Sequence, residues 1–262
     1  MTNLGGREGS GDQAGTGART GRSRARRSVP GSASSPAGRG SFRAVIFDLD
    51  GVLVDSEIWW DEVRADFARR HGRPWTEADR AAVMGANSRQ WSETMRTRLG
   101  LPLSAAEIER EIVDGVVGRY RSEGAPVIDG AVDVVRRLRG RYRIAVASSA
   151  HREVIDAALE ALGLVDAFDA VVSSDEVARG KPAPDVYLET ARRLGVLPAD
   201  CLVVEDSLNG VLAARAAGMT VVLVPNASVP PAPGAREAAS AVLARISELD
   251  PEALARSAGR TE

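Results

Sequence analysis

Two aspartates, one residue apart, directly follow a short apolar run near the start of the ordered-looking sequence. The run at 45–47 (Val-Ile-Phe) predicts a buried strand, because β-branched and aromatic side chains suit a pleated surface. At its carboxyl end Asp48 could act as a nucleophile and metal ligand, while Asp50 could donate and accept a proton. Gly51 then lets the chain turn away from the strand. A plain acidic turn has the same composition, so the remaining sequence has to decide between the two interpretations.

Four further polar side chains lie at or near the ends of later apolar runs. They are Ser148, Lys181, Glu205 and Asp206. In an open parallel α/β sheet the carboxyl ends of the strands meet at one edge, and ligands bind there. We therefore expect these four side chains to share one pocket with Asp48 and Asp50.

This combination of groups suits phosphoryl transfer. A phosphate monoester dianion repels a carboxylate nucleophile, so attack by Asp48 requires cations that neutralise both. Asp48 and Asp206 offer oxygen ligands of the kind that Mg²⁺ prefers. Lys181 supplies a fixed positive charge, and Ser148 supplies a hydroxyl with neighbouring backbone N–H donors.

Apolar runs alternate with amphipathic segments from residue 127 onward, which predicts strands alternating with helices. With the first strand, the expected strands lie at 45–47, 143–147, 170–172, 201–204 and 220–224. The expected helices between them lie at 131–139, 151–162, 184–194 and 208–217. Five strands in this order predict an α/β fold with a doubly wound parallel sheet, that is, a Rossmann-like core.

The segment at 55–125 contains no convincing strand and reads as an all-helical cap inserted after the first strand. Four helices are expected, at 55–71, 76–84, 88–99 and 104–120, the last with a capping box formed by Ser104 and Glu107. We predict a core domain at 41–54 and 126–250, a cap domain at 55–125 and a frayed end at 251–262. Within the core domain, 235–249 is expected to form a terminal helix.

Composition narrows the class of protein. The 262 residues are 44% hydrophobic, carry a net charge of -2 and contain no apolar run long enough to span a membrane. We therefore expect neither a nucleic-acid nor a membrane partner. A lone cysteine, Cys201, suits the reducing cytoplasm.

Residues 1–40 hold seven arginines and two acids in a Gly- and Ser-rich context, so we expect a disordered basic tail there, with a polyanion-binding tail as the alternative.

Four segments together carry a resemblance to a known superfamily. They read DLDGVLVDS, VASS, GKPAPDVY and VVEDSLNGV, and they occur in this order at the predicted strand ends. In this respect the chain resembles the haloacid dehalogenase-like hydrolase superfamily. Within it, the chain is most similar to the group with a helical cap, which includes β-phosphoglucomutases and sugar-phosphate or phosphoglycolate phosphatases.

The resemblance implies a role for each motif residue. Asp48 would form an aspartyl phosphate, and Asp50 would protonate the leaving alcohol and then activate water. Ser148 and Lys181 would bind the phosphoryl oxygens, with backbone N–H groups near Gly51. A Mg²⁺ cofactor would be held by Asp48, by the Asp50 carbonyl and by Asp206, with Glu205 either joining the ligands or ordering the metal-bound waters.

Substrate recognition is expected from the cap. The GANSR segment aligns with the loop that similar proteins use to read the substrate, so Arg89, Asn87 and Ser88 are candidate contacts; a simple helix start with a capping residue is the alternative. Trp60 is expected to face the site, whereas Trp59 and Trp91 are expected in the core of the cap.

Two residues outside the motifs are candidates for an outer layer of contacts. Ser149 lies next to Ser148, and Asp175 could support Lys181 or form a turn. The two histidines, His71 and His151, are expected at the surface.

The sequence thus predicts a cytoplasmic, monomeric, Mg²⁺-dependent phosphatase that acts on small phosphorylated metabolites. Asp50 favours phosphoryl transfer over dehalogenation, since displacing a halide needs no proton donor. The similar mutases carry a histidine where Trp60 aligns, so hydrolysis is favoured over a β-phosphoglucomutase-like isomerisation, which remains the alternative. A catalytically idle phosphate sensor is the alternative outside enzymes.

Overall fold

A parallel sheet organises the computed structural model, which describes residues 41–83 and 88–257. The strand order is β3-β2-β1-β4-β5-β6, and every pair is parallel. The strands are β1 (Ala44–Phe47), β2 (Arg143–Ser148), β3 (Ala170–Ser173), β4 (Cys201–Glu205), β5 (Thr220–Leu223) and β6 (Ala241–Val242). The predicted α/β class with a doubly wound parallel sheet is confirmed.

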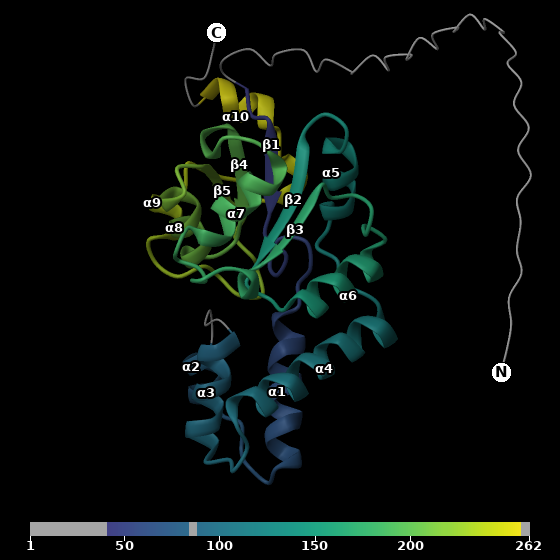
Figure 1. Ribbon diagram of the computed structural model, residues 1–262, viewed down its shortest axis with the longest axis vertical. Helices are drawn as coiled ribbons and strands as arrows, with labels where there is room; N and C mark the ends of the chain where they lie inside the picture. The colour runs from purple at the N-terminus through teal and green to yellow at the C-terminus, as the bar shows by residue number, and fades with distance from the viewer. Residues whose placement is uncertain (1–40, 84–87, 258–262) are drawn as a thin grey trace, which may run out of the picture. The chain divides into compact units, whose positions relative to one another are not determined.

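Helices cover both faces of the sheet, as Figure 1 shows. Alternate strand residues point to opposite faces, so Val45 and Phe47 of β1 belong to one buried cluster while Ala44 and Ile46 belong to the other. The first cluster packs against α5 (Ala131–Leu138), α6 (Arg152–Leu162) and α10 (Pro251–Ser257). The second packs against α7 (Asp185–Leu194), α8 (Leu208–Ala216) and α9 (Ala235–Ala238).

The chain changes direction across the sheet between β1 and β4. From β1 it moves outward through β2 to β3, and β4 then pairs with the opposite side of β1. Such a reversal opens a crevice at the carboxyl ends of the two central strands. Asp48 follows β1 and Asp206 follows β4, so both acids lie at this point.

Four helices fill the connection between β1 and α5 (Figure 1). They are α1 (Glu57–Arg70), α2 (Glu77–Val83), α3 (Ser88–Leu99) and α4 (Ala105–Glu123). The predicted capping box of Ser104 and Glu107 starts α4. Buried Phe67, Met95 and Ile112 pack between these helices, and they belong to the same buried cluster as one face of the sheet.

The two chain segments that join the cap to the sheet lie side by side. Val54 and Val127 form an antiparallel bridge. The Asp55 amide donates to the Pro126 carbonyl (2.8 Å), and the Ile128 amide donates to the Leu53 carbonyl (3.1 Å). Both ends of the cap therefore emerge next to the β1 terminus. The exact domain boundaries, 55–125 against 41–54 and 126–250, stay a prediction, since all described residues belong to one compact unit.

The end of the chain differs from the expectation. The predicted helix at 235–249 is instead α9, then β6 paired with β5, then the 3₁₀ turn η3 (Ile246–Glu248). The segment at 251–262 was expected to fray, yet residues 251–257 form α10. The helix is capped by the Asp250 carboxylate, which accepts hydrogen bonds from the amides of Glu252 (3.0 Å) and Ala253 (3.1 Å). Pro251 lies in its first turn, where proline is favoured. Shorter 3₁₀ turns are η1 (Ser174–Glu176) and η2 (Pro198–Asp200).

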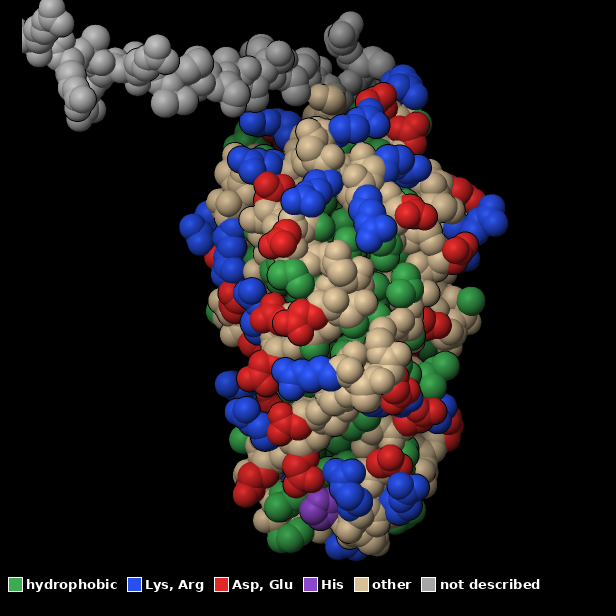
Figure 2. Space-filling view, turned by 90° about the vertical axis from the view of Figure 1, so that its right-hand side faces the viewer, with side chains coloured by type: hydrophobic (Ala, Val, Ile, Leu, Met, Phe, Trp, Pro, Cys, Tyr) green, Lys and Arg blue, Asp and Glu red, His purple; other side chains and the backbone are tan. Residues whose placement is uncertain are grey.

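Three of the sequence-based expectations fall on other parts of the chain. The basic tail at 1–40, the loop residues Gly85 and Asn87, and the last residues 258–262 lie outside the described residues. None of the helices that the structure describes combines the length and hydrophobicity needed to cross a membrane. On the face shown in Figure 2, basic and acidic side chains are interspersed rather than gathered by sign.

Candidate active site

A cavity of about 370 Å³ lies at the carboxyl edge of the sheet, a volume suited to a small metabolite. Residues from three separate strand ends line it, together with residues of α1 and α3. Asp48 and Asp50 come from the end of β1, Ser148 from the end of β2 and Asp206 from the end of β4. Lys181 reaches the same cavity from the loop before α7.

Lys181 connects the two central strand ends. Its ammonium donates to Asp48 Oδ1 (2.8 Å), to Glu205 Oε1 (2.6 Å) and to the Ala147 carbonyl (3.2 Å). Burial acts to lower the pKa of Lys181, but Asp48 and Glu205 raise it well above its usual value. Burial also raises the pKa of Asp48, to about 7, against the attraction of Lys181. The site therefore holds a fixed cation against the predicted nucleophile.

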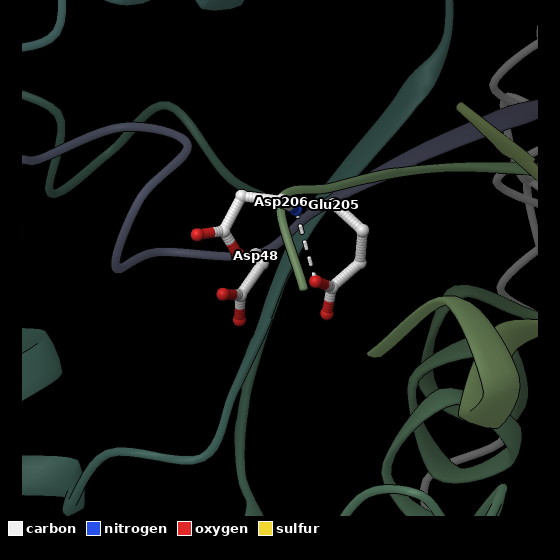
Figure 3. A group of neighbouring side chains, drawn as sticks. All are labelled: Asp48, Glu205 and Asp206. Atoms are coloured by element: carbon white, nitrogen blue, oxygen red, sulfur yellow. Dashed lines mark hydrogen bonds between the residues drawn. The ribbon is translucent and has the colours of Figure 1, made fainter. Parts of the chain in front are cut away.

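The carboxylate of Glu205 is fully buried and already has five protein donors. Its Oε1 accepts from Lys181 and from the Tyr187 hydroxyl (2.7 Å). Its Oε2 accepts from the Asp206 amide (3.1 Å), drawn as the dashed line in Figure 3, and from the amide and hydroxyl of Ser207 (3.1 and 3.0 Å). A carboxylate offers about four lone-pair sites, so these donors occupy Glu205. The geometry favours a role in holding Lys181 over direct metal ligation.

The donor set fits a divalent cation. Asp48, Glu205 and Asp206 each have a carboxylate oxygen within 4.8 Å of the others (Figure 3), and of the three Asp48 and Asp206 are the better placed to bind the ion, since protein donors occupy Glu205. Burial raises the pKa of Asp206 well above its usual value, and the negative charges of Glu205 and Asp48 raise it further. Gly51 leaves the space that the Asp206 carboxylate occupies, since a Cβ on Gly51 would lie 2.0 Å from Asp206 Oδ2. The carboxylates of Asp48, Glu205 and Asp206 lie close together, and the ammonium of Lys181 offsets only part of their negative charge. A bound cation would offset more of it, and carboxylate oxygens are ligands that Mg²⁺ prefers.

Asp50 lies between β1 and α1, where the chain leaves the sheet for the cap. Its carboxylate accepts from the Ser56 hydroxyl. Burial raises the pKa of Asp50, while interactions with the side chains of Ser56 and Trp60 act to lower it. A carboxyl group with a raised pKa and a held orientation can carry a proton to and from a reacting oxygen.

Ser148 ends β2 and Ser149 follows it, and both line the cavity with the carboxylates. Ser148 is 1% exposed and its hydroxyl accepts from the Ala150 amide (3.0 Å), while Ser149 also lines the cavity. Phosphate binding by backbone N–H groups near Gly51 stays a prediction, and the amide of Gly51 itself lies in a turn. Its amide donates to the Val54 carbonyl (2.7 Å) in a turn that requires its positive φ of 80°. Gly51 therefore contributes the turn and the space for Asp206, and its own N–H is already bonded.

The expected substrate contacts of the cap divide into two groups. Trp60 and Ser88 line the cavity, as predicted from their positions. Arg89 is exposed and is not among the residues lining the cavity, and Asn87 lies outside the described residues. Trp91, expected only in the core of the cap, also lines the cavity, because it packs edge-on against Trp60 with ring centroids 6.3 Å apart.

Of the two roles expected for Asp175, support of Lys181 or a turn, the structure shows the turn, since Asp175 lies in η1. Its carboxylate lies 2.8 Å from His151 Nδ1, whereas Lys181 takes its ion pairs from Asp48 and Glu205. The other ring nitrogen of His151 lies 2.8 Å from Glu109 of α4. His151, expected to be an ordinary surface residue, thus joins the cap to the sheet.

Several residues of the site escaped the sequence reasoning. Tyr187 lies in the recognised GKPAPDVY segment and Gly210 in the NGV segment, so their motifs were the available signal. Glu57 and Arg64 line the cavity from α1, but nothing in the helical pattern separates them from solvated charges. The loop at 229–232 also lines the cavity, and it follows Asn226 and Ser228, which donate to Asp55 (3.0 and 2.5 Å).

Comparison with known proteins gives consistent matches. Residues 42–218 match the sequence family described as haloacid dehalogenase-like hydrolase. The chain is 33% identical over 181 residues to the fructose-1-phosphate phosphatase YqaB of Escherichia coli (strain K12), which covers 69% of this chain and 95% of that protein. The chain is also 31% identical over 194 residues to the bifunctional riboflavin kinase/FMN phosphatase of Arabidopsis thaliana. This match covers 70% of the chain but only 48% of the Arabidopsis protein.

A solved structure resembles the fold closely. The crystal structure of CbbY from Rhodobacter sphaeroides in complex with phosphate superposes with a TM-score of 0.69 at 26% identity. The match covers 79% of this chain and 96% of CbbY. It therefore spans most of the part of the chain that the structure describes.

Proposed function

Because the chain belongs to the haloacid dehalogenase-like hydrolase family, we propose that it hydrolyses small phosphorylated carbohydrates with Mg²⁺ through an aspartyl phosphate. Its expected enzyme class, a phosphoric monoester hydrolase, is confirmed by relatives that are named as phosphatases. The observation that carries the proposal is the ion pair between Lys181 and Asp48, beside Asp206, at the crevice between β1 and β4. The phosphate bound by the similar CbbY supports the same reaction class.

In the first half-reaction Asp48 attacks phosphorus. A bond forms between its carboxylate oxygen and phosphorus, and the ester P–O bond breaks. Asp50 donates its proton to the departing alcohol oxygen, so the alcohol leaves neutral. In the second half-reaction Asp50 takes a proton from water as the water oxygen attacks phosphorus, which releases phosphate and restores the Asp48 carboxylate.

The surrounding residues compensate charge and hold the groups in place. Lys181 and Ser148 would bind the phosphoryl oxygens, and Glu205 would position Lys181 through its 2.6 Å contact. Asp48, Asp206 and the Asp50 carbonyl would hold Mg²⁺, which supplies positive charge for the phosphoryl group and the attacking carboxylate. The helical segment at 55–125 would act as a cap domain that excludes water from the cavity.

We place this enzyme in the cytoplasm as a monomer. The buried single cysteine Cys201 agrees with a reducing compartment. The interspersed charges on the face in Figure 2 agree with the absence of a polyanion-binding surface there.

Phosphate release is the direct test. Purified full-length protein with Mg²⁺ is expected to release phosphate from p-nitrophenyl phosphate and from fructose 1-phosphate. Asp48→Asn and a chelator are each expected to abolish release, and added Mg²⁺ to restore it after chelation. An inert wild type would favour the phosphate-sensor alternative. Interconversion of β-glucose 1-phosphate and glucose 6-phosphate without net release would instead identify a mutase.

A further inference from the structure

Arg64 places a buried guanidinium group in the wall of the cavity. The residue lies in α1 and is only 8% exposed. Its guanidinium carbon lies 5.2 Å from the centroid of the Trp60 ring and 5.3 Å from that of Trp91. The two indoles cover the cation, and all three side chains line the cavity.

The guanidinium has unused hydrogen-bonding capacity. Its Nε is buried and has no hydrogen-bond partner among the residues that the structure describes. Such a group is costly to bury when its N–H donors stay unbonded. Arg64 also lines the cavity, where a ligand can supply acceptors to the rest of the guanidinium group.

Glu57, a hydrogen-bond acceptor, lies about two helical turns from Arg64 on the same face of α1. Glu57, Trp60 and Arg64 follow the i, i+3, i+7 spacing that aligns side chains on one face of a helix, and all three line the cavity. Glu57 offers carboxylate oxygens, Arg64 offers a planar set of donors, and the indoles offer an apolar surface. This is the set of groups that a hydroxylated carbon chain can use.

The distribution of charge argues against an anionic group at this position. Burial lowers the pKa of Arg64, while the negative charges of Glu57, Asp61 and Asp50 act to raise it. Asp61 is already engaged with Arg80 (2.6 Å) and Trp75 (2.8 Å), but Glu57 and Asp50 line the cavity itself. A carboxylate or second phosphate placed beside Arg64 would therefore meet two acids, whereas a hydroxyl can donate to Glu57 and accept from Arg64.

Building on the proposed phosphatase function, we propose that Arg64, Glu57 and the indoles of Trp60 and Trp91 bind the hydroxyl groups of a neutral sugar or polyol leaving group. The substrate class is then a monophosphate of a polyhydroxylated carbon chain. Monophosphates that carry a carboxylate, and bisphosphates, are poor substrates.

Three phosphate esters test this subsite. Fructose 1-phosphate has a neutral hydroxylated leaving group, 2-phosphoglycolate carries a carboxylate, and p-nitrophenyl phosphate has no hydroxyls. The wild type is expected to prefer fructose 1-phosphate to 2-phosphoglycolate in kcat/KM by about tenfold or more. Arg64→Met and Glu57→Gln are each expected to lower the ratio of kcat/KM for fructose 1-phosphate to that for p-nitrophenyl phosphate by about tenfold, mainly through KM.

Arg69→Met is the matched control, because Arg69 lies on the same helix with a side chain that is 77% exposed and paired with Asp66. It is expected to leave the substrate ratio unchanged. Circular dichroism checks that each variant folds, and Arg64→Lys, which keeps the charge but loses the planar donor set, serves if Arg64→Met does not fold.

Binding without turnover separates failure of the subsite from failure of the proposed function. Fructose 1-phosphate is titrated into Asp48→Asn and into Asp48→Asn with Arg64→Met by calorimetry. A loss of affinity of about tenfold in the double variant supports the subsite even if no ester is hydrolysed. Equal affinities, an unchanged substrate ratio in both single variants, or a wild-type preference for 2-phosphoglycolate would overturn the subsite while leaving phosphatase activity intact.

Discussion

The ammonium of Lys181 lies 2.8 Å from Asp48 Oδ1, so the predicted nucleophile has a cation beside it before any substrate arrives. The same ammonium lies 2.6 Å from Glu205, which keeps it at this position. Removing the charge would leave Asp48 and Glu205 repelling each other in a buried site. Lys181 should therefore contribute more to the stability of the site than the cation of a solvent-exposed ion pair does.

Lys181→Met is expected to reduce kcat for p-nitrophenyl phosphate by about 10² to 10³-fold, because a charge stabilising the transferring phosphoryl group is lost. Arg179→Met serves as the control. Arg179 lies in the same loop, pairs with Asp185 and has a side chain that is 70% exposed, so its rate should match the wild type. Steady-state rates at saturating Mg²⁺ make the comparison. A Lys181→Met enzyme within threefold of the wild type would contradict the role of Lys181.

Gly51→Ala is expected to weaken metal binding. A Cβ there would lie 2.0 Å from Asp206 Oδ2, and the φ of +80° disfavours any side chain. Displacing the Asp206 carboxylate should raise the Mg²⁺ concentration for half-maximal rate by about tenfold or more. Gly72→Ala has a similar φ of +67° but no atom within 4 Å, so it carries the backbone strain alone. Equal Mg²⁺ requirements in the two variants would show that Asp206 is not the affected ligand.

Gly210→Ala is expected to destabilise the fold. Its Cβ would lie 1.7 Å from Glu205 Oε1, and moving that carboxylate would break its bonds to Lys181 and Tyr187. Disturbing a buried, fully bonded charge should lower the free energy of unfolding by about 3 kcal/mol. Gly118→Ala, in an exposed part of α4 with nothing within 4 Å, should instead raise it by about 1 kcal/mol. Urea unfolding of both variants measures the difference, and similar midpoints would refute the packing argument.

The residues that sequence reasoning placed correctly depend on local pattern and sheet geometry. Asp48, Ser148 and Asp206 were predictable because an apolar run ends directly before the first two and one residue before Asp206, and parallel strands bring such ends to one edge. The cap was predictable from helical periodicity and from the Ser104 capping box.

The residues that it missed depend on contacts between distant segments. The alanine-rich stretch at 235–249 suits a helix, but pairing of β6 with β5 overrides that propensity. Arg64 was not singled out from the sequence, and Trp91, which approaches it from α3, helps to bury it. The contact between Asp175 and His151 could not be predicted from the sequence. It depends on the position of His151 next to Glu109 of α4, which residue spacing does not reveal.

His151 provides a pH-dependent contact between the cap and the sheet. Its two ring nitrogens lie 2.8 Å from Glu109 of α4 and 2.8 Å from Asp175 after β3. Burial acts to lower the pKa of His151, but Asp175 and Glu109 outweigh it, so the pKa is raised above its ordinary value of 6.5. A raised pKa means that the folded state binds the proton more tightly, so this stabilisation is complete below pH 6.5 and is lost as pH rises through the folded-state pKa.

His151→Gln is therefore expected to lower the free energy of unfolding by about 1 kcal/mol at pH 5.5 and by much less at pH 8.5. His71→Gln is the matched control, since His71 is the other histidine of the chain and its contact with Glu111 is longer, at 3.8 Å. It shows what loss of a histidine without two close carboxylate partners does at each pH. Urea unfolding of wild type and both variants at each pH gives the four differences. A His151→Gln penalty that is equal at both pH values, or larger at pH 8.5, would mean that His151 acts by packing and not as a charged bridge between Glu109 and Asp175.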